Sequence, residues 1–157
     1  MSKPDASDAP RESIARNKRA RHDYEILDTW EAGLVLRGTE VKALREGRAN
    51  LTDAYGVIMD GEVWLLNLNI GAYGLANRFN HDATRSRKLL LHTREIRRMI
   101  GAIERQGLTL VPLELYFVRG RAKVLLGLGR GKKAHDKRED IKRRDADREI
   151  ARALRHR

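Results

Sequence analysis

The sequence predicts a mainly β protein, an antiparallel OB-fold-like closed barrel with two short helices and a basic C-terminal tail. Short runs rich in Val, Leu and aromatic residues follow one another along the chain, as in proteins built from many strands. Two junctions between these runs, Asp60-Gly61 and Arg119-Gly120, carry hairpin-turn residues. The chain lacks the β-α-β alternation of a parallel sheet, and a β-sandwich is the alternative architecture.

The N-terminal part predicts a leader, a basic arm and a first strand. Residues 1–15 combine two of the three prolines with scattered polar side chains and no apolar period, so we expect a disordered leader. Residues 16–22 form a basic arm that leads into a strand from Tyr24. Gly33 lies between two apolar runs and predicts a bulge or bend in this strand.

The middle of the chain predicts a helix, a hairpin and a loop. A short helix over residues 40–46 begins after Thr39 and ends at Gly47. Strands over 54–59 and 62–70 form a hairpin around Asp60-Gly61. Residues 71–83 are expected to form a long loop.

The second half predicts a strand from Arg87, an amphipathic helix and a final hairpin. The helix is capped by Thr93 and ends at Gly107, and its other face is basic. Its apolar side chains recur at helical spacing, at Ile96, Met99, Ile100 and Ile103. Strands over 108–118 and 122–128 complete the barrel, so residues 16–129 form one domain.

Residues 130–157 predict a basic tail that is disordered in isolation and helical on a polyanionic surface. They hold 12 basic and 6 acidic side chains, and their large apolar residues are only Ile141, Ile150 and Leu154. Three such residues cannot bury a helix face. A stable exposed helix is the alternative, because Glu139/Arg143 and Asp140/Arg144 have the i, i+4 spacing of ion pairs.

Composition favours a polyanionic partner and disfavours catalysis. The chain of 157 residues has 33 Lys and Arg against 22 Asp and Glu, a formal net charge of +11, and clustered cations gain affinity by releasing counterions from phosphates. It has no cysteine, which excludes disulfides, thiol nucleophiles and cysteine-based zinc sites. No apolar run suits a membrane span or signal peptide, so we expect a cytoplasmic protein without a membrane partner.

Local motifs point to RNA contacts rather than to an enzyme. Residues 129–133 resemble a phosphate-binding loop, but Leu126 and Lys133 replace its required glycine and hydroxyl residue. His22-Asp23 and His81-Asp82 lack accompanying ligands or a nucleophile, so we expect no metal and no cofactor and interpret them as RNA contacts. Tyr24 is the aromatic residue expected to stack on a base, whereas spacing alone leaves Glu31 open between an RNA contact and an exposed strand residue.

Several segments resemble the SmpB family, the SsrA- or tmRNA-binding proteins of bacterial trans-translation. The resemblance extends over residues 16–144. It rests on Asn17-Lys18-Arg19-Ala20-Arg21-His22, Glu31-Ala32-Gly33-Leu34, Gly38-Thr39-Glu40-Val41-Lys42, Phe79-Asn80-His81-Asp82, Thr84-Arg85-Ser86-Arg87-Lys88 and His135-Asp136-Lys137-Arg138.

The resemblance implies a barrel that binds the tRNA-like domain of tmRNA, and a tail that enters the decoding site and mRNA channel of the ribosome. One copy per tmRNA would fill a vacant A site, rescue the stalled ribosome and permit tagging of the nascent peptide. The implied tmRNA-binding residues are Asn17, Lys18, Arg19, Arg21, His22, Glu31 and Leu91. The implied ribosome-binding residues are Gly131, Lys132, Lys133, His135, Asp136, Lys137, Arg138 and Leu154. A generic structured-RNA or ribosome-associated module and a small metal-dependent nuclease are the alternatives.

Overall fold

The computed structural model describes residues 10–72, 81–132 and 148 of the chain. The elements follow in the order β1 (Arg11–Arg16), α1 (Ala20–Asp23), β2 (Tyr24–Leu34), α2 (Gly38–Arg45), β3 (Ala49–Asn50), β4 (Tyr55–Met59), β5 (Glu62–Leu66), β6 (Asn69–Ile70), β7 (Arg87–Leu90), α3 (Thr93–Gln106), β8 (Thr109–Val118) and β9 (Arg121–Gly131). None of the helices in the described ranges combines the length and apolar composition that a bilayer crossing requires.

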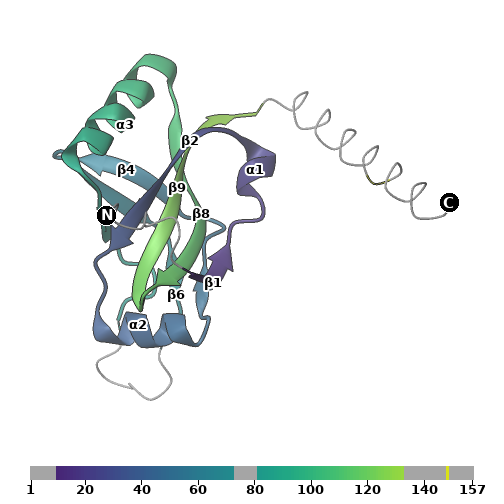
Figure 1. Cartoon of the computed structure of the whole chain (residues 1–157), viewed down its shortest axis with the longest axis vertical. Helices are drawn as coiled ribbons and strands as arrows, with labels where there is room; N and C mark the ends of the chain where they lie inside the picture. The colour runs from purple at the N-terminus through teal and green to yellow at the C-terminus, as the bar shows by residue number, and fades with distance from the viewer. Residues whose placement is uncertain (1–9, 73–80, 133–147, 149–157) are drawn as a thin grey trace, which may run out of the picture.

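Strands of the described region close into the predicted antiparallel barrel (Figure 1). Around the ring, β8 pairs with β9, β9 with β2, β2 with β7, β7 with β5, and β5 with β4. The ring closes where β4 returns to β8 at the pair Gly56 and Leu110. A Cβ on Gly56 would lie 2.7 Å from Cβ of Leu110, so glycine permits the close approach of these strands.

The barrel interior is filled by apolar side chains, and helices cover its ends. Val63, Leu65, Leu115 and Leu126 are among the side chains with no exposed surface. α2 lies at one end of the barrel and α3 at the other (Figure 1), and residues of both helices join the same core. Burial of these faces supplies the main favourable contribution to folding.

Both predicted hairpins are confirmed. Asp60 and Gly61 have φ angles of 52° and 74°, and Arg119 and Gly120 have φ angles of 50° and 76°. Two successive positive φ angles are the requirement of a type I′ turn, whose twist matches that of the flanking strands. The turns join β4 to β5 and β8 to β9 in register.

The prediction of a disordered leader through residue 15 is wrong over residues 11–15. These residues belong to β1, which pairs antiparallel with β8 from Arg11 opposite Val118 to Arg16 opposite Glu114. β4 contacts β8 only at Leu110, so the rest of that β8 edge offers unpaired backbone groups to another strand. An exposed strand that is held by backbone pairing needs no apolar periodicity. The sequence of β1 therefore carries no signal that predicts a strand. Residues 1–9 lie outside the described residues.

The helix starts also differ from the predictions. α2 begins two residues earlier than expected, after Arg37, and α3 begins after His92. In each helix, a glutamate in the first turn accepts a hydrogen bond from the backbone N–H of the residue before the helix: Glu40 from Arg37 at 2.9 Å, and Glu95 from His92 at 3.0 Å. These glutamates cap the helices in place of the predicted threonines. The described residues hold three helices rather than two, and α3 spans 14 residues.

Two strand predictions need correction. The irregularity of β2 against β9 lies between Ile26 and Asp28 rather than at Gly33, which stays in register with Lys123. β9 continues beyond the predicted tail boundary, because Arg130 and Gly131 pair with Glu25 and Tyr24. The backbone hydrogen bonds of β2 extend the strand through residues whose composition indicated a tail.

Candidate nucleic-acid interface

One outer face of the barrel is formed by β1, β8, β9 and β2. Tyr24 and Glu31 lie on its strands, and the basic arm lies beside it. Directly opposed residues of paired strands project to the same side. The register places Ser13, Tyr116 and Lys123 in one row across the sheet, and Arg16, Glu114, Leu125 and Glu31 in the neighbouring row. α1 and the exit of β9 lie at the Tyr24 end of the same strands. We call the outer surface of these four strands, together with α1, the β1–β2 face.

Glu31 is held in place by two residues that the sequence did not single out. Its Oε2 accepts a 2.6 Å hydrogen bond from the Tyr116 hydroxyl and lies 3.7 Å from Nη2 of Arg11. The Arg11 guanidinium also lies 4.5 Å from the centroid of the Tyr116 ring, a cation–π distance. Burial raises the pKa of Tyr116, and the Glu31 carboxylate raises it further. The hydroxyl therefore stays a donor at neutral pH, and Glu31 is a fixed, partly exposed acceptor.

Asn17 is buried, and its side chain forms hydrogen bonds within the protein. The chain of β8 shifts register between Pro112 and Glu114, so carbonyl groups at this point are available outside the strand ladder. The Asn17 side-chain amide donates to the carbonyl of Pro112 at 3.0 Å and to that of Leu51 at 3.4 Å, and its backbone N–H donates to Leu113 at 2.9 Å. The amide hydrogens are therefore used inside the fold, and Asn17 positions the basic arm.

The cations of the arm face solvent around the short helix α1. Lys18, Arg19 and Arg21 are exposed and form no ion pair within the described residues, whereas Ala20 is buried. Ala20 packs against Val111 and Leu113 on the outside of the barrel. This contact holds one turn of helix against the sheet and leaves its charges available to a polyanion.

Tyr24 packs across Gly129, which has no side chain to obstruct it. A Cβ on Gly129 would lie 3.0 Å from Cβ of Tyr24 and 3.3 Å from its ring. Gly129 therefore makes room for Tyr24. The Tyr24 side chain is half-buried and belongs to a small cluster with Ile26 and Leu125, which fixes its orientation and leaves part of it accessible.

The first two residues of the predicted ribosome-binding set are held by β2 and α1. Gly131 pairs with Tyr24, the backbone N–H of Lys132 donates to the Asp23 carbonyl at 2.9 Å, and Lys132 Nζ donates to the Arg21 carbonyl at 3.0 Å. The chain therefore leaves the barrel beside the basic arm. The remaining predicted tail residues lie outside the described residues: Lys133, His135, Asp136, Lys137, Arg138 and Leu154.

The predicted residues do not converge on one point. Tyr24 and Glu31 are seven positions apart in β2, a distance of about 23 Å at the rise of a strand. His22 lies in α1 at the Tyr24 end. Leu91 follows β7, is half-buried and packs against the barrel core. The geometry thus indicates an extended surface that an RNA would contact along its length.

Comparisons with known proteins show which family the chain belongs to. A family model described as "SmpB protein" matches residues 14–156. The chain belongs to the SmpB family. The SsrA-binding protein of Geobacillus thermodenitrificans is 58% identical over 144 residues, which cover 92% of this chain and 93% of the relative. That of Acidothermus cellulolyticus is 58% identical over 149 residues, covering 95% and 94%.

A solved structure described as "tmRNA-SmpB: a journey to the center of the bacterial ribosome" is also similar to this chain. The TM-score is 0.66 and the sequence identity 54%, over 81% of this chain and 93% of that chain. Both the sequence and the fold of the SmpB family are therefore present here.

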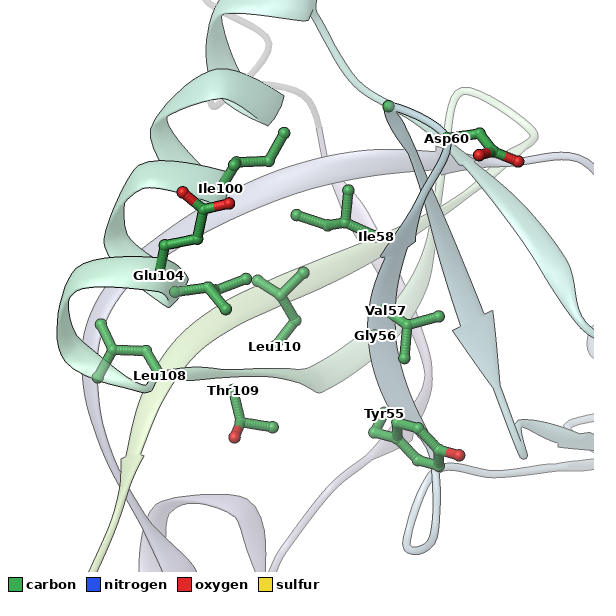
Figure 2. A pocket seen from close by; sticks show the side chains of 12 residues that line it. Tyr55, Gly56, Val57, Ile58, Asp60, Ile100, Glu104, Leu108, Thr109 and Leu110 are labelled. Carbon is green, nitrogen blue, oxygen red and sulfur yellow. The ribbon is translucent and has the colours of Figure 1, made fainter.

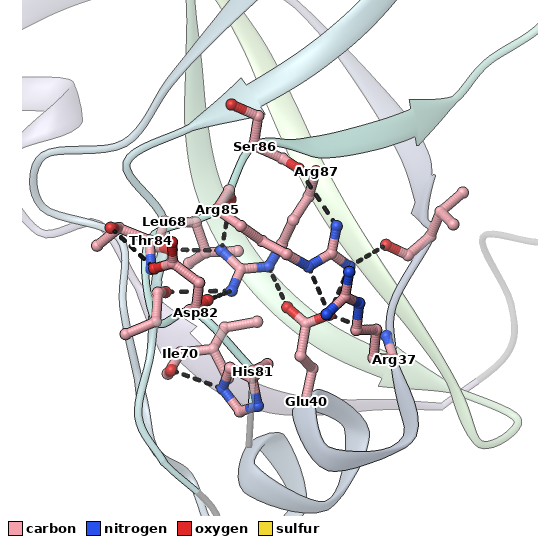
Figure 3. A network of polar contacts seen from close by, with 12 residues as sticks. Arg37, Glu40, Leu68, Ile70, His81, Asp82, Thr84, Arg85, Ser86 and Arg87 are labelled. Atoms are coloured by element: carbon pink, nitrogen blue, oxygen red, sulfur yellow. Dashed lines mark hydrogen bonds and ion pairs between the residues drawn. The ribbon is translucent and has the colours of Figure 1, made fainter. Parts of the chain in front are cut away.

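This SmpB-family chain also contains a buried ion cluster that sequence analysis did not predict (Figure 3). Glu40 and Arg87 are fully buried; the Arg87 Nε–H donates to Glu40 Oε2, and Arg85 Nε donates to Oε1 at 3.0 Å. The other Arg87 donors reach the backbone carbonyls of Leu68, Asp82, Ala83 and Arg85. All five N–H groups of the guanidinium are thus satisfied, which ties α2 to residues 68 and 81–87.

Burial by itself raises the pKa of Glu40, but hydrogen bonds to Arg85, the backbone of Arg37 and Arg87 outweigh burial and lower it. The carboxyl is therefore ionised in the folded protein at neutral pH. Two arginines, at 85 and 87, lead into an apolar strand of the core. This pattern could have predicted the cluster, because a buried arginine requires a partner.

His81 belongs to the same region and is not available as the predicted RNA contact. It is 8% exposed; its Nε2 lies 2.9 Å from the Ile70 carbonyl and its Nδ1 lies 3.0 Å from Oγ1 of Thr39. A carbonyl only accepts, so Nε2 carries a proton. Figure 3 shows the ring beside the ion cluster, with its contact to Ile70. The described residues contain no group of three or more side chains suited to hold a metal ion.

Proposed function

We propose that this protein binds the tRNA-like domain of tmRNA with its β1–β2 face and delivers it to the vacant A site of stalled ribosomes. Relatives that are 55–58% identical carry the name SsrA-binding protein, and the similar solved structure names tmRNA and the bacterial ribosome. The observation that carries the proposal is the oriented Glu31 carboxylate on a face whose arm is basic.

The basic and acidic residues of the face have different roles in RNA recognition. Lys18, Arg19 and Arg21 neutralise phosphates, which supplies affinity without selectivity. Glu31 repels phosphates but accepts hydrogen bonds from base amino groups or 2′-hydroxyls, which supplies selectivity for a folded RNA. Tyr24 offers the exposed part of its ring for stacking, and Asn17 and Leu91 act through the placement of the arm and of the β7–α3 junction.

The tail would act on the ribosome. We infer that residues 133–157 enter the decoding site and the mRNA channel, become helical there, and present His135 to a base of the ribosomal RNA. The contacts of Lys132 with α1 support a tail that starts beside the bound tmRNA. In this function the protein is a cytoplasmic adaptor without a cofactor, present as one copy per tmRNA.

The substitution Glu31→Gln tests the tmRNA site. Both Glu31→Gln and the control Glu62→Gln remove one negative charge, but Glu62 lies on β5, across the barrel from β9, in a surface pair with Lys88. Gel-shift titration with the tRNA-like domain should show at least fivefold weaker binding for Glu31→Gln and no change for Glu62→Gln. Equal or tighter binding by Glu31→Gln would refute the site.

Competition separates this function from a generic RNA module. An excess of an unrelated structured RNA at near-physiological salt should leave the wild-type complex intact, because base and 2′-hydroxyl contacts are less sensitive to salt than phosphate contacts. Displacement at equal concentration would favour the generic module. Cleavage of the RNA on addition of Mg²⁺ or Mn²⁺ would instead indicate a nuclease.

A truncation tests the tail. Because residues 130–132 are held by β2 and α1, the informative truncation begins at Lys133 and leaves them in place. It should retain tmRNA binding and abolish peptide tagging on stalled ribosomes. A parallel loss of both activities would assign the tail to the tmRNA site.

A further inference from the structure

We propose that the exposed face of α3 is a second RNA-backbone contact, which extends the β1–β2 face beyond β2; the inference rests on the proposed function. This face carries Arg94, Arg97, Arg98 and Arg105, all exposed, with Gly101 between them. On a helix with 3.6 residues per turn these five residues fall within about 100° of arc and extend over about 16 Å. We call them the arginine stripe.

The arginine stripe works against the stability of its own helix. Arg94 has like charges three and four residues ahead of it, which destabilises an isolated helix. Arg94, Arg97 and Arg98 lie in the first two turns, where the helix dipole disfavours cations. Gly101 weakens the helix interior. An anion bound along the stripe would reverse the two electrostatic effects.

None of the four stripe arginines forms an ion pair within the described residues. The Arg105 side chain lies over Gly101, since a Cβ there would be 3.1 Å from Nη2 of Arg105. The stripe is thus a set of exposed guanidinium groups without an ion-pair partner among the described residues, and one of them covers Gly101.

The two sides of α3 differ in charge, and this difference determines the side from which an RNA approaches. Towards β2, a hollow of about 570 Å³ is lined by Asp28, Thr29, Trp30, His92, Arg94, Glu95 and Arg98. Its two acids are occupied: Asp28 accepts from the backbone N–H of Thr29 at 2.8 Å, and Glu95 from that of His92 at 3.0 Å. The two carboxylates and the two arginines leave this hollow without net formal charge, and Arg94 and Arg98 supply its cationic donors.

Towards β4, the hollow is unsuited to a polyanion. It has a volume of about 590 Å³ and is lined mainly by apolar side chains such as Ile58, Ile100 and Leu110. Figure 2 shows that its charged side chains are the carboxylates Asp60 and Glu104. Like charge would repel phosphates from this side, so the β2 side remains.

The β2 hollow continues the proposed tmRNA-binding face. Thr29 is two residues from Glu31, and both belong to β2. Leu91, which we propose places the β7–α3 junction, directly precedes His92, the residue before α3. An RNA placed on Glu31 would therefore reach the arginine stripe without leaving the barrel surface. All four cations are arginines, whose planar fork binds phosphates in a bidentate manner.

The test is the salt dependence of binding to the tRNA-like domain of tmRNA. In the stripe variant, Arg94, Arg97 and Arg98 are replaced by Gln, which keeps helix propensity. In the control variant Arg37, Arg45 and Arg119 are replaced by Gln; all three are exposed and lie directly before α2, in α2 and in the β8–β9 turn. Circular dichroism should show the same helix content for both variants.

The expected result is a roughly tenfold or greater loss of affinity for the stripe variant. Its slope of log affinity against log salt should fall by about two, since each lost phosphate contact contributes about 0.7 to 0.9. The control should bind as the wild type. Combining the stripe changes with Glu31→Gln should give additive losses, because the two sites read different parts of the RNA.

An unchanged slope would overturn the proposal, and so would a variant that binds this RNA normally but binds ribosomes weakly. Failure of the proposed function has a separate sign. It would appear as a wild-type protein that does not prefer the tRNA-like RNA over the structured competitor. In that case the slopes of the two variants would still decide whether the arginine stripe contacts RNA.

Discussion

The hydroxyl of Tyr116 donates a 2.6 Å hydrogen bond to Oε2 of Glu31, across 85 positions of sequence. Arg11 adds its charge to the same carboxylate from β1 and lies over the Tyr116 ring. The pair joins neighbouring rows of the β1–β2 face and holds an acidic acceptor in one orientation. A fixed acceptor loses less entropy on binding than a mobile one.

The substitution Tyr116→Phe should therefore weaken tmRNA binding while the protein stays folded. Hydrogen bonds to charged groups contribute about 1.5 to 3 kcal/mol, and partial exposure of Glu31 reduces this, so we expect a loss of about 1 kcal/mol in the free energy of unfolding. RNA affinity should fall less than for Glu31→Gln. Urea denaturation and gel-shift titration measure the two effects, with the exposed Tyr55→Phe as control. Unchanged RNA binding would show that Glu31 needs no fixed orientation.

The substitution Asn17→Ala should destabilise the arm. It leaves the Pro112 and Leu51 carbonyls without the amide donor in a buried position, and an unsatisfied buried polar group costs about 1 to 3 kcal/mol. Hydrogen exchange of residues 17–23 should accelerate together with this loss. Asn69→Ala, the same change at an exposed position, should have little effect. A stable variant with protected arm amides would contradict the positioning role.

The substitution Arg87→Met should be among the most damaging in the barrel. Removing one partner of a buried ion pair costs about 3 to 5 kcal/mol, and this change leaves Glu40 Oε2 without its buried donor although Arg85 still contacts Oε1. At the next position, Lys88→Met breaks a pair in which both side chains are partly exposed, and the expected loss is below about 1 kcal/mol. Chemical denaturation of both variants checks the contrast. Similar losses for the two would mean that Arg85 alone compensates Glu40.

The stability of the protein should fall in acid through Glu40. Because the pKa of Glu40 is lower in the folded protein than its ordinary value, its ionised form favours folding. This contribution is complete above the ordinary carboxyl pKa and is lost as the pH falls through the lower folded pKa. The free energy of unfolding measured against pH should decline in this window. Glu40→Gln should be less stable at neutral pH and show a flatter profile; an equal slope would assign the acid sensitivity to other carboxyls.

The elements that were predicted correctly are those whose signals are local. Asp60-Gly61 and Arg119-Gly120 form their turns because the required φ angles depend on a few neighbouring residues. The amphipathic pattern of α3 and its end at Gly107 follow from the helical period. The basic arm and the uneven charge are properties of composition. Helix starts were displaced by one or two residues because glutamates inside the helices supplied the caps.

The sequence by itself determined the barrel class, both hairpins, the buried face of α3 and the excess of basic charge, because each follows from local conformation or composition. Only the tertiary structure decided that β1 completes the β8 edge, that Tyr116 and Arg11 hold Glu31, and that Arg87 is buried against Glu40. These contacts join residues far apart in sequence. They depend on strand register and on barrel closure at Gly56 and Leu110, which no local pattern encodes.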